Sequence, residues 1–254
     1  MLNKIRNRLS APLGHVFVSS RVDDAYICAY PRSGSTWLRT ILVNIIDPSA
    51  DSNPDVFNAR IPAVSIRNAK SINSLESPRL IMTHSCWRPV INKSVYLVRD
   101  GRDSFISSYY YHTVRQGATL DLEQYLDRYI SREYGVTWAE HTESWLNAGR
   151  STLSDQLHMI RFEDMKKNTH EVIRGICEFL NIDTNDNTIV TAIDKASLHN
   201  VRKIERRRQA MDVNGSSSFY RGGRVEQWKD PKYSEVIKAF ELHFNSALKC
   251  ATYL

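Results

Sequence analysis

The residues from 26 to 37 have the types and the order of a phosphate-binding loop. A short apolar run with high β propensity, 25–30, ends at Pro31, and an apolar pattern of helical period begins at Trp37. Between them stand a cation, a glycine and three hydroxyl residues: Arg32, Ser33, Gly34, Ser35 and Thr36. Glycine lets the backbone close on a ligand, and the first N–H groups of a helix can donate to an anion. The segment therefore predicts a phosphate loop, although an ordinary strand-to-helix turn with a capping hydroxyl fits the same residues.

A second candidate anion site lies near the middle of the chain. Arg99 stands at the end of the apolar run 94–98, and Ser107 follows eight residues later in a segment of helical character. A guanidinium provides a two-pronged set of donors and a serine provides a hydroxyl, so the two could converge on one phosphate. Surface arginines beside a helix start are the alternative interpretation of this segment.

His84 is the candidate general base. It follows the apolar run 79–83, and a histidine with a near-neutral pKa can accept the proton of an attacking hydroxyl. A single histidine is also compatible with a purely structural role. None of the other seven histidines has a comparable setting, and His112 is interpreted as a packing or surface residue. Clustered carboxylates and His- or Cys-rich metal spacings do not occur, so no metal is predicted.

The elements that must position these residues alternate between strand and helix. Strands are predicted at 25–30, 79–83, 94–98 and 156–161. Helices are predicted at 36–46, 102–115, 122–132, 137–148, 171–180 and 234–244. This alternation indicates the α/β class, with an open parallel sheet flanked by helices on both faces. Ligands of such sheets bind at the carboxyl ends of the strands, where the 31–36 loop would lie.

The composition favours one α/β domain and an anionic ligand. The chain has 254 residues, 42% of them hydrophobic, and a formal net charge of +6, so a single domain over 1–254 is expected. Nucleic acid, an acidic membrane or a phosphorylated nucleotide would each fit this charge. Much of it lies in the run 202–208, within a segment of about 200–220 that predicts a flexible flap. Residues 47–77, rich in Pro, Asn, Ser and Asp, predict a long loop that faces substrate or is mobile.

The cysteines and the hydropathy pattern indicate a cytoplasmic protein. The four cysteines lie far apart without a Cys-x-x-Cys pair, which is typical of reduced thiols. No apolar run has the length of a signal-peptide core or of a bilayer span, so we expect no membrane partner.

Taken together, these segments resemble sulfotransferases that use 3′-phosphoadenosine 5′-phosphosulfate (PAPS). The sequence Tyr-Pro-Arg-Ser-Gly-Ser-Thr-Trp at 30–37 is similar to the family's 5′-phosphosulfate loop, usually Tyr-Pro-Lys-Ser-Gly-Thr-Thr-Trp. The Arg and Ser of 99–107 have the spacing of its 3′-phosphate motif. Residues 79–89 resemble its Lys-Thr-His-x-x-Pro segment, with Met82 in place of Lys. Residues 219–229 resemble its Phe-x-Arg-Lys-Gly…Trp-Lys segment, with Gly222 in place of Lys.

The resemblance implies a P-loop-kinase-like sulfotransferase fold and transfer of a sulfuryl group from PAPS to a hydroxyl or amine of a small-molecule acceptor. The product would be adenosine 3′,5′-bisphosphate (PAP). His84 would be the general base, and Arg32 would stabilise the leaving phosphate. The residues implied to bind the nucleotide are Arg32, Ser33, Gly34, Ser35, Thr36, Trp37, Arg99, Ser107, Phe162, Leu198, Arg221, Gly222 and Gly223.

The family pattern also has gaps in this chain. The family's dimerisation segment is not reproduced after Trp228, so the oligomeric state stays open. The acceptor cannot be identified from the residues, and its pocket is expected near the tyrosines of 109–111 and the loop 47–77.

Two other functions compete with the sulfotransferase interpretation. A phosphate-loop kinase or nucleotide hydrolase would need an atypical loop without Gly-Lys-Ser/Thr, and it would leave Arg99 and Ser107 without a role. A nucleic-acid-binding module would use the basic run 202–208. Under the sulfotransferase interpretation no nucleic-acid partner is expected.

Overall fold

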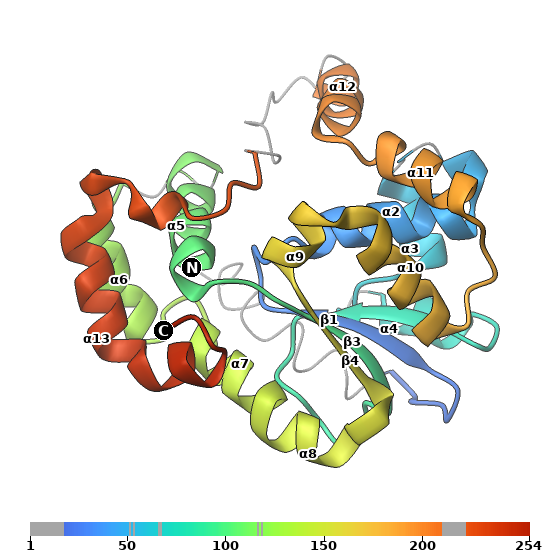
Figure 1. Ribbon diagram of the computed structural model, residues 1–254, viewed down its shortest axis with the longest axis horizontal. Coiled ribbons are helices and arrows are strands. Elements are labelled where there is room, and N and C mark those ends of the chain that lie inside the picture. The colour runs from blue at the N-terminus through green and yellow to red at the C-terminus, as the bar shows by residue number, and fades with distance from the viewer. Residues whose placement is uncertain are drawn as a thin grey trace.

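A four-stranded parallel sheet forms the centre of the computed structural model, which describes residues 18–50, 52, 54–65, 68–115, 117, 119–209 and 222–254. The strands lie in the order β2-β1-β3-β4 (Figure 1). Their bounds are β1 (Ala25–Ala29), β2 (Leu80–Thr83), β3 (Lys93–Val98) and β4 (Leu157–Arg161). All four predicted strands are therefore confirmed, as is the α/β class with a parallel sheet.

The parallel register brings the ends of the strands to one edge of the sheet. Ala29 pairs with Leu97, and Val98 pairs with Arg161. In the order of the sheet, the residues directly after the four strands are His84, Tyr30, Arg99 and Phe162. Because carboxyl ends of parallel strands form the usual ligand-binding edge, residues far apart in sequence meet there.

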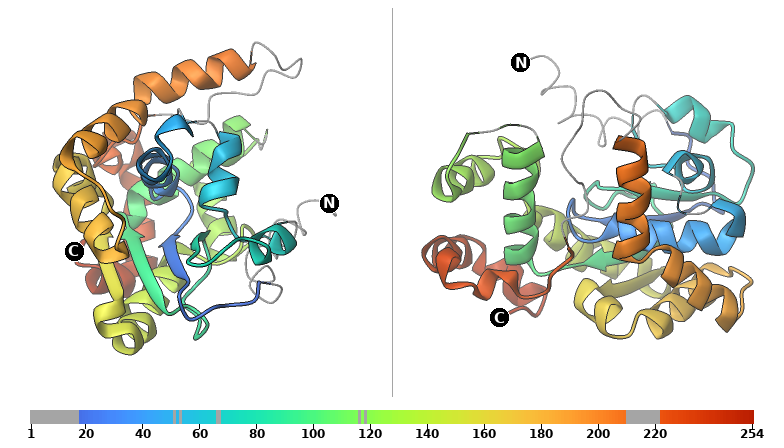
Figure 2. Two further views of the ribbon diagram at one scale, coloured as in Figure 1. Left: turned by 90° about the vertical axis from the view of Figure 1, so that its right-hand side faces the viewer. Right: turned by 90° about the horizontal axis from the view of Figure 1, so that it is seen from above.

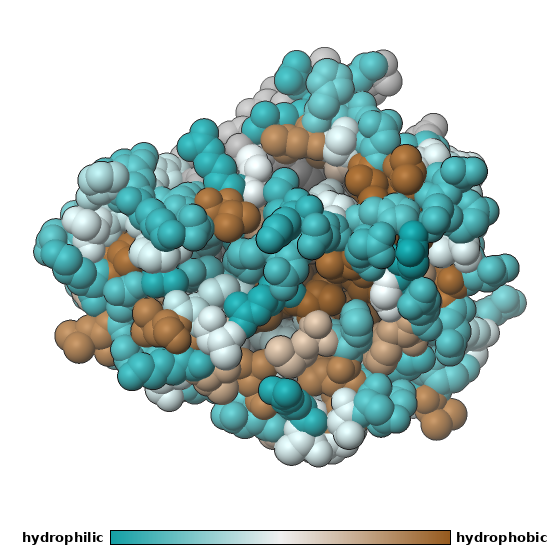
Figure 3. All heavy atoms as spheres, in the orientation of Figure 1, coloured by the Kyte–Doolittle hydropathy of each residue, from teal (hydrophilic) through white to brown (hydrophobic). Residues whose placement is uncertain are grey.

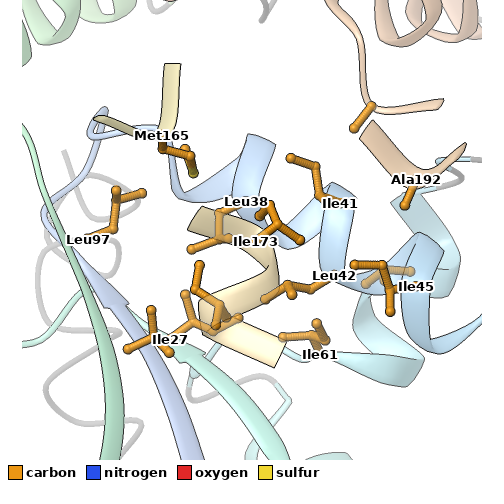
Figure 4. Packing of buried hydrophobic residues seen from close by; sticks show 14 of the residues in the cluster. Ile27, Leu38, Ile41, Leu42, Ile45, Ile61, Leu97, Met165, Ile173 and Ala192 are labelled. Atoms are coloured by element: carbon orange, nitrogen blue, oxygen red, sulfur yellow. The ribbon is translucent and has the colours of Figure 1, made fainter. Parts of the chain in front are cut away.

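Helices cover the first face of the sheet and bury its largest apolar cluster. They are α2 (Ser35–Ile46), α3 (Pro54–Arg60), α9 (Phe162–Lys167), α10 (Thr169–Leu180) and α11 (Asp186–Lys195). Figure 4 shows Ile27 of β1 facing Leu38 and Leu42 of α2 and Ile173 of α10. These side chains are completely buried, and each such burial stabilises the fold by about 1.5–3 kcal/mol.

The opposite face packs on a second apolar cluster, because side chains of a strand alternate between faces. Tyr26, Tyr96 and Val98 project to this side and pack with Trp145 and Leu153. The covering elements are α4 (Ala69–Asn73), α7 (Trp138–Ser144), the π-helix η3 (Trp145–Gly149) and α8 (Arg150–Leu153).

A third cluster, rich in aromatic rings, fills the space between the helices at one end of the molecule. These are α5 (Gly101–Tyr110), the π-helix η2 (Tyr111–Arg115), α6 (Leu122–Ile130) and α13 (Ser234–Cys250). Figures 1 and 2 show α5, α6 and α13 grouped apart from α2, α10 and α11. Phe105 packs 5.2 Å from Phe240 and 5.4 Å from Tyr129, measured between ring centroids.

Short 3₁₀ turns complete the described backbone. They are η1 (Pro48–Ala50), η4 (Ser154–Gln156), η5 (Gln227–Lys229) and η6 (Pro231–Tyr233). Arg102 contacts η5, because its guanidinium lies 3.6 Å from the centroid of the Trp228 ring. The same guanidinium pairs with Asp100 at 2.7 Å and with Glu241 at 2.5 Å.

Several predicted boundaries are wrong. The described part of 47–77 contains η1, α3 and α4 rather than one long loop. The helix predicted at 102–115 changes to a π-helix at Tyr111, and the one predicted at 137–148 does so at Trp145. The last helix continues from the expected end at 244 to Cys250, past a non-helical backbone at Phe244. Helix α11 was not predicted, because its apolar face is short.

The segment predicted to be a flap at about 200–220 begins with the helix α12 (Leu198–Gln209). Residues 210–220 lie outside the described part. Leu198, Val201 and Ile204 repeat every three residues and form a narrow apolar stripe, of which Val201 is 5% exposed. Most of the other positions carry strong helix formers such as Arg, Lys and Glu, so the helix forms with little burial.

The surface seen in Figure 3 is mostly hydrophilic, with hydrophobic side chains in small separate groups. In the described part of the chain, no helix combines the length and apolar character needed to cross a bilayer. The four cysteines are free thiols.

Candidate functional site

A cleft of about 1170 Å³ opens at the carboxyl edge of the sheet. Its walls come from the 30–37 loop, the residues after β2 and β3, the end of α5, the start of α9, and residues 222–233. The candidate residues Arg32, His84, Arg99 and Ser107 all line it. The structure therefore brings the phosphate loop, the mid-chain motif and the candidate base to one cavity.

The 31–36 loop delivers the start of α2 to this cleft. Gly34 is the N-cap of α2 with a left-handed φ of 96°, and its carbonyl accepts from the N–H groups of Trp37 and Leu38. Ser35 and Thr36 are the first helical residues, so their N–H groups have no intrahelical acceptor. Both residues line the cleft, which gives it donors suited to a phosphate.

Glycine is required at position 34 for a steric reason as well. A Cβ at Gly34 would lie 2.4 Å from Cδ2 of Phe162, which is far inside van der Waals contact. Phe162 thus packs directly on the loop. Ser33 differs from its neighbours, because its hydroxyl is completely buried 3.4 Å from the Ser104 hydroxyl and its N–H donates to the Tyr30 carbonyl.

Arg32 joins the loop to the mid-chain motif. Its Nε donates to Oγ of Ser107 at 3.3 Å, and its guanidinium lies 5.0 Å from the ring centroid of Tyr111. Arg99 donates from Nη1 to the Arg32 carbonyl at 2.9 Å and from Nη2 to the Arg224 carbonyl at 2.6 Å. The Arg99 and Ser107 side chains, predicted to converge, both contact Arg32.

The surroundings of Arg99 fit an anionic ligand. Its side chain is 4% exposed, and burial lowers its pKa despite the Asp103 carboxylate at 3.6 Å. Arg99 Nε is buried, and no described group accepts its hydrogen bond. A buried guanidinium with an unused donor favours an added phosphate, because charge-assisted hydrogen bonds would satisfy that donor and balance the charge.

Asp103 ties the C-terminal segment to this motif. Its carboxylate accepts from the N–H groups of Glu226 at 2.9 Å and Trp228 at 3.2 Å. Gly222 and Gly223, which precede this anchor, line the cleft, and a Cβ at Gly223 would lie 3.4 Å from Phe162. Arg221 lies outside the described residues.

Aromatic side chains form the part of the cleft expected to hold a purine. Trp37 and Phe162 lie edge to face, with ring centroids 6.2 Å apart and planes at 74°. Nζ of Lys166 lies 5.0 Å from the Trp37 ring, and Leu198, 38% exposed, lines the same cleft. Guanidinium Cζ of Arg99 lies 4.5 Å from the Phe162 ring.

His84 is held in one tautomer by the end of β1. Its Nδ1 lies 2.7 Å from the Ala29 carbonyl, which can only accept, so Nδ1 carries the proton and Nε2 is the basic nitrogen. Burial lowers the pKa of His84, and the charges of Arg39 and Arg32 lower it further. The ring is therefore neutral at pH 7 and able to accept a proton.

The structure also places residues in the cleft that the sequence did not predict. They are Tyr30, Arg88, His112, Tyr125, Tyr129, Tyr134 and Tyr233. Nδ1 of His112 lies 2.8 Å from the Tyr125 hydroxyl, and its ring stacks 4.4 Å from that of Tyr134. Only the helical continuation of α5 from Ser107 toward 115 gave a signal that His112 would lie near the site.

Of the two segments expected near the acceptor pocket, 109–111 and 47–77, only the first contributes to the described lining of the cleft. Tyr110 and Tyr111 line the cleft, whereas Tyr109 donates to the Leu120 carbonyl and packs on Tyr125. None of the described residues between 47 and 77 reaches the cleft.

Comparisons with known proteins agree with this architecture. The family model for the sulfotransferase domain matches residues 22–251. Sulfotransferase 1E1 of Bos taurus is 26% identical over 259 residues, covering 92% of this chain and 86% of that protein. Sulfotransferase 1B1 of Canis lupus familiaris is 28% identical over 238 residues, covering 83% and 78%.

Solved structures with the same fold include mouse sulfotransferase SULT7A1 complexed with PAP. It has a TM-score of 0.71 and 20% identity, covering 97% of this chain and 93% of that one. Retinol dehydratase in complex with retinol and PAP has a TM-score of 0.70 and 17% identity, covering 91% and 83%. The match of the family model over most of its length shows that this chain belongs to the family of PAPS-dependent sulfotransferases.

Proposed function

We propose that this enzyme transfers the sulfuryl group of PAPS to a hydroxyl or amine of a small-molecule acceptor. The observation that carries the proposal is that His84 and the loop residues Arg32, Gly34, Ser35 and Thr36 line one cleft. A base beside a phosphate cradle supports a reaction in which an acceptor is deprotonated while a phosphate leaves. A small acceptor fits the cleft volume of about 1170 Å³.

PAPS supplies a sulfuryl group attached to a phosphate that becomes the leaving group. In the proposed complex, Arg32 and the N–H groups of Ser35 and Thr36 bind the 5′ end, while Arg99 and Ser107 bind the 3′-phosphate. The further nucleotide contacts proposed are Gly34, Trp37, Phe162, Leu198, Arg221, Gly222 and Gly223; Ser33, whose hydroxyl is buried against Ser104, is proposed to support the loop instead. The buried, unused Nε of Arg99 supports this assignment.

Arg32 is proposed to stabilise negative charge on the leaving phosphate without donating a proton. The pKa of a guanidinium is too high for proton transfer near pH 7, and its planar donors suit two phosphate oxygens. Its bonding to Ser107 and its position over Tyr111 support a location between the nucleotide and the acceptor. Arg32→Ala is expected to lower turnover, and unchanged turnover would remove this role.

His84 is proposed to accept the acceptor proton at Nε2. The Ala29 carbonyl fixes the ring orientation through Nδ1, and burial keeps the imidazole neutral. General-base catalysis of this kind typically contributes about 10²–10⁴-fold to the rate. His84→Ala should therefore lower transfer by about 10²-fold or more while PAP still binds.

The experiment is an acceptor screen with PAPS in which mass spectrometry detects the added sulfuryl group. Wild type, His84→Ala and His243→Ala are compared; His243 is exposed on α13 outside the cleft and serves as the matched control. Competition between PAP and ATP tests the nucleotide preference, because a kinase would favour ATP. Absence of PAPS-dependent sulfonation across the panel would contradict the whole proposal. Near-normal transfer by His84→Ala would contradict the role of His84 as the base.

A further inference from the structure

The cationic side chains of the cleft fall into two groups. Among the described lining residues they are Arg32, Arg88, Arg99, Lys166, Arg224 and Lys232. Arg99 donates to the Arg32 carbonyl, and Arg32 donates to the Ser107 hydroxyl. Lys166 lies over the Trp37 ring on the proposed purine side. Arg224 follows Gly223, which approaches Phe162 on that same side. These cations are therefore available to the nucleotide.

Lys232, another cation of the lining, already has an anionic partner. Its Nζ lies 3.0 Å from Oδ2 of Asp230. Glu226, the other carboxylate lining the cleft, lies 2.6 Å from Nζ of Lys229. The acidic side chains of the described lining are thus engaged with lysines.

Arg88 lacks such a partner. It lies four residues after His84, is partly buried and lines the cleft. No described residue forms an ion pair or hydrogen bond with its guanidinium. Glu140, whose charge and that of Arg88 both act on the Cys86 thiol, is engaged with Arg132 and with the N–H and hydroxyl of Thr137. A partly desolvated guanidinium without a counter-ion favours an anionic ligand.

The backbone that carries Arg88 is anchored rather than loose. The Trp87 N–H donates to the Ser144 hydroxyl at 3.1 Å, and the Trp145 indole donates to the Ser85 carbonyl at 3.1 Å. The Ile91 N–H donates to the carbonyl of Arg88 itself at 2.9 Å. His84 and Arg88 are therefore held at a fixed spacing, and four residues of chain limit it to about 14 Å between their Cα atoms.

We propose that Arg88 binds a carboxylate or phosphate-type group of the acceptor, so that the preferred substrates are hydroxylated aromatic anions. This proposal rests on the proposed sulfuryl transfer. The reacting hydroxyl lies at His84 Nε2, the aromatic body lies among the tyrosines of the cleft, and the anion pairs with the Arg88 fork. Arginine suits this task because its planar donors match two oxygens of one group.

The test compares acceptors that share a 4-hydroxyphenyl body and differ in the group at its other end. Wild type, Arg88→Gln and Arg88→Lys are assayed with 3-(4-hydroxyphenyl)propanoate, its methyl ester and (4-hydroxybenzyl)phosphonate. Wild type should prefer the anions over the ester in kcat/KM by roughly 10- to 100-fold, the range expected for a hydrogen-bonded charge pair. Arg88→Gln should reduce the ratio to about 1–3, and Arg88→Lys should keep part of it. The phosphonate arm shows which oxyanion is preferred.

A binding measurement separates this proposal from the transfer reaction. Calorimetric titration of the propanoate and its ester into the protein with PAP reports the same preference without turnover. Lys249→Gln removes an exposed charge of α13 and serves as the control. If wild type prefers the ester, or if Arg88→Gln keeps the wild-type ratio in binding and turnover, the Arg88 proposal is overturned. Anion-selective binding without any sulfonation would instead overturn the proposed function and leave the anion site supported.

Discussion

Replacement of Gly34 by alanine tests whether the phosphate loop and the purine side are one packed unit. The added Cβ would lie 2.4 Å from Cδ2 and 2.6 Å from Cε2 of Phe162, while the backbone stays at a φ of 96°. The left-handed backbone costs an L-residue about 1–2 kcal/mol. Overpacking against a buried ring adds about 1–3 kcal/mol, so we expect a loss of roughly 2–5 kcal/mol in unfolding free energy.

Gly135 provides a matched control for the backbone term. Its φ is 100°, and a Cβ there would meet nothing within 4 Å. Gly135→Ala should therefore cost only about 1–2 kcal/mol. Urea unfolding of the two variants isolates the steric term, and PAP titration reports its effect on the site. Gly34→Ala should weaken PAP binding, since the clash displaces a ring that also contacts Arg99 and Trp37.

A double-mutant cycle assigns the clash to Phe162. Phe162→Ala removes the ring, so Gly34→Ala in that background should lose its steric cost and retain only the backbone cost of about 1–2 kcal/mol. The reasoning is refuted if Gly34→Ala costs no more than Gly135→Ala, or if its cost is the same with and without the Phe162 ring.

Three further predictions concern buried ionisable groups. Asp24→Asn should cost about 3–5 kcal/mol of unfolding free energy, because it removes one partner of the fully buried ion pair with Arg79 (2.6 Å). The double variant Asp24→Asn with Arg79→Met should recover much of this loss. A cost below about 1 kcal/mol for Asp24→Asn would contradict the prediction. His84 must be neutral to act as a base, and burial lowers its pKa. The value of kcat/KM should therefore rise with pH below pH 6.5 and then level off. A rise of kcat/KM that occurs above pH 7 would exclude His84 as the titrating group. Burial raises the pKa of Asp103 to about 6, so between about pH 4 and 6 the folded protein binds more protons than the unfolded chain. The Asp103 contribution to stability therefore falls as pH rises through this window. Asp103→Asn should flatten this dependence of the unfolding free energy on pH, measured by urea unfolding, and an unchanged slope would refute the prediction.

The strands and the phosphate loop could be predicted because their signals are local. An apolar β-prone run followed by proline, glycine and hydroxyl residues specifies strand, tight turn and helix start within a dozen residues. Arg99 and His84 were also accessible, since each directly follows such a run. The α12 helix was missed because its stability depends on helix-forming charged residues rather than on a wide apolar face.

The proposed acceptor side could not be predicted, because it depends on which of the surrounding charged groups form ion pairs with each other. Arg88 is a single arginine between Trp87 and Pro89, and its lack of a counter-ion appears only once Glu140 is seen bound to Arg132. His112 enters the cleft through the π-helical turn after α5, which shifts side chains relative to a regular helix. Neither feature has a sequence signature at the level of residue type or spacing.

The two sides of the cleft are built by different parts of the fold, and this has a consequence for specificity. The proposed nucleotide side consists mainly of residues immediately after β1, β3 and β4, whose positions are fixed by the register of a buried sheet. The proposed acceptor side consists of the 84–88 segment, the π-turn at Tyr111 and the 134–136 turn, which are attached to that frame by a few hydrogen bonds such as Trp87 to Ser144. Substitutions on the acceptor side can therefore change the acceptor without displacing the donor-binding residues. Arg88 is the clearest case, because its charge faces the cleft while its backbone, rather than its side chain, carries the structural contacts.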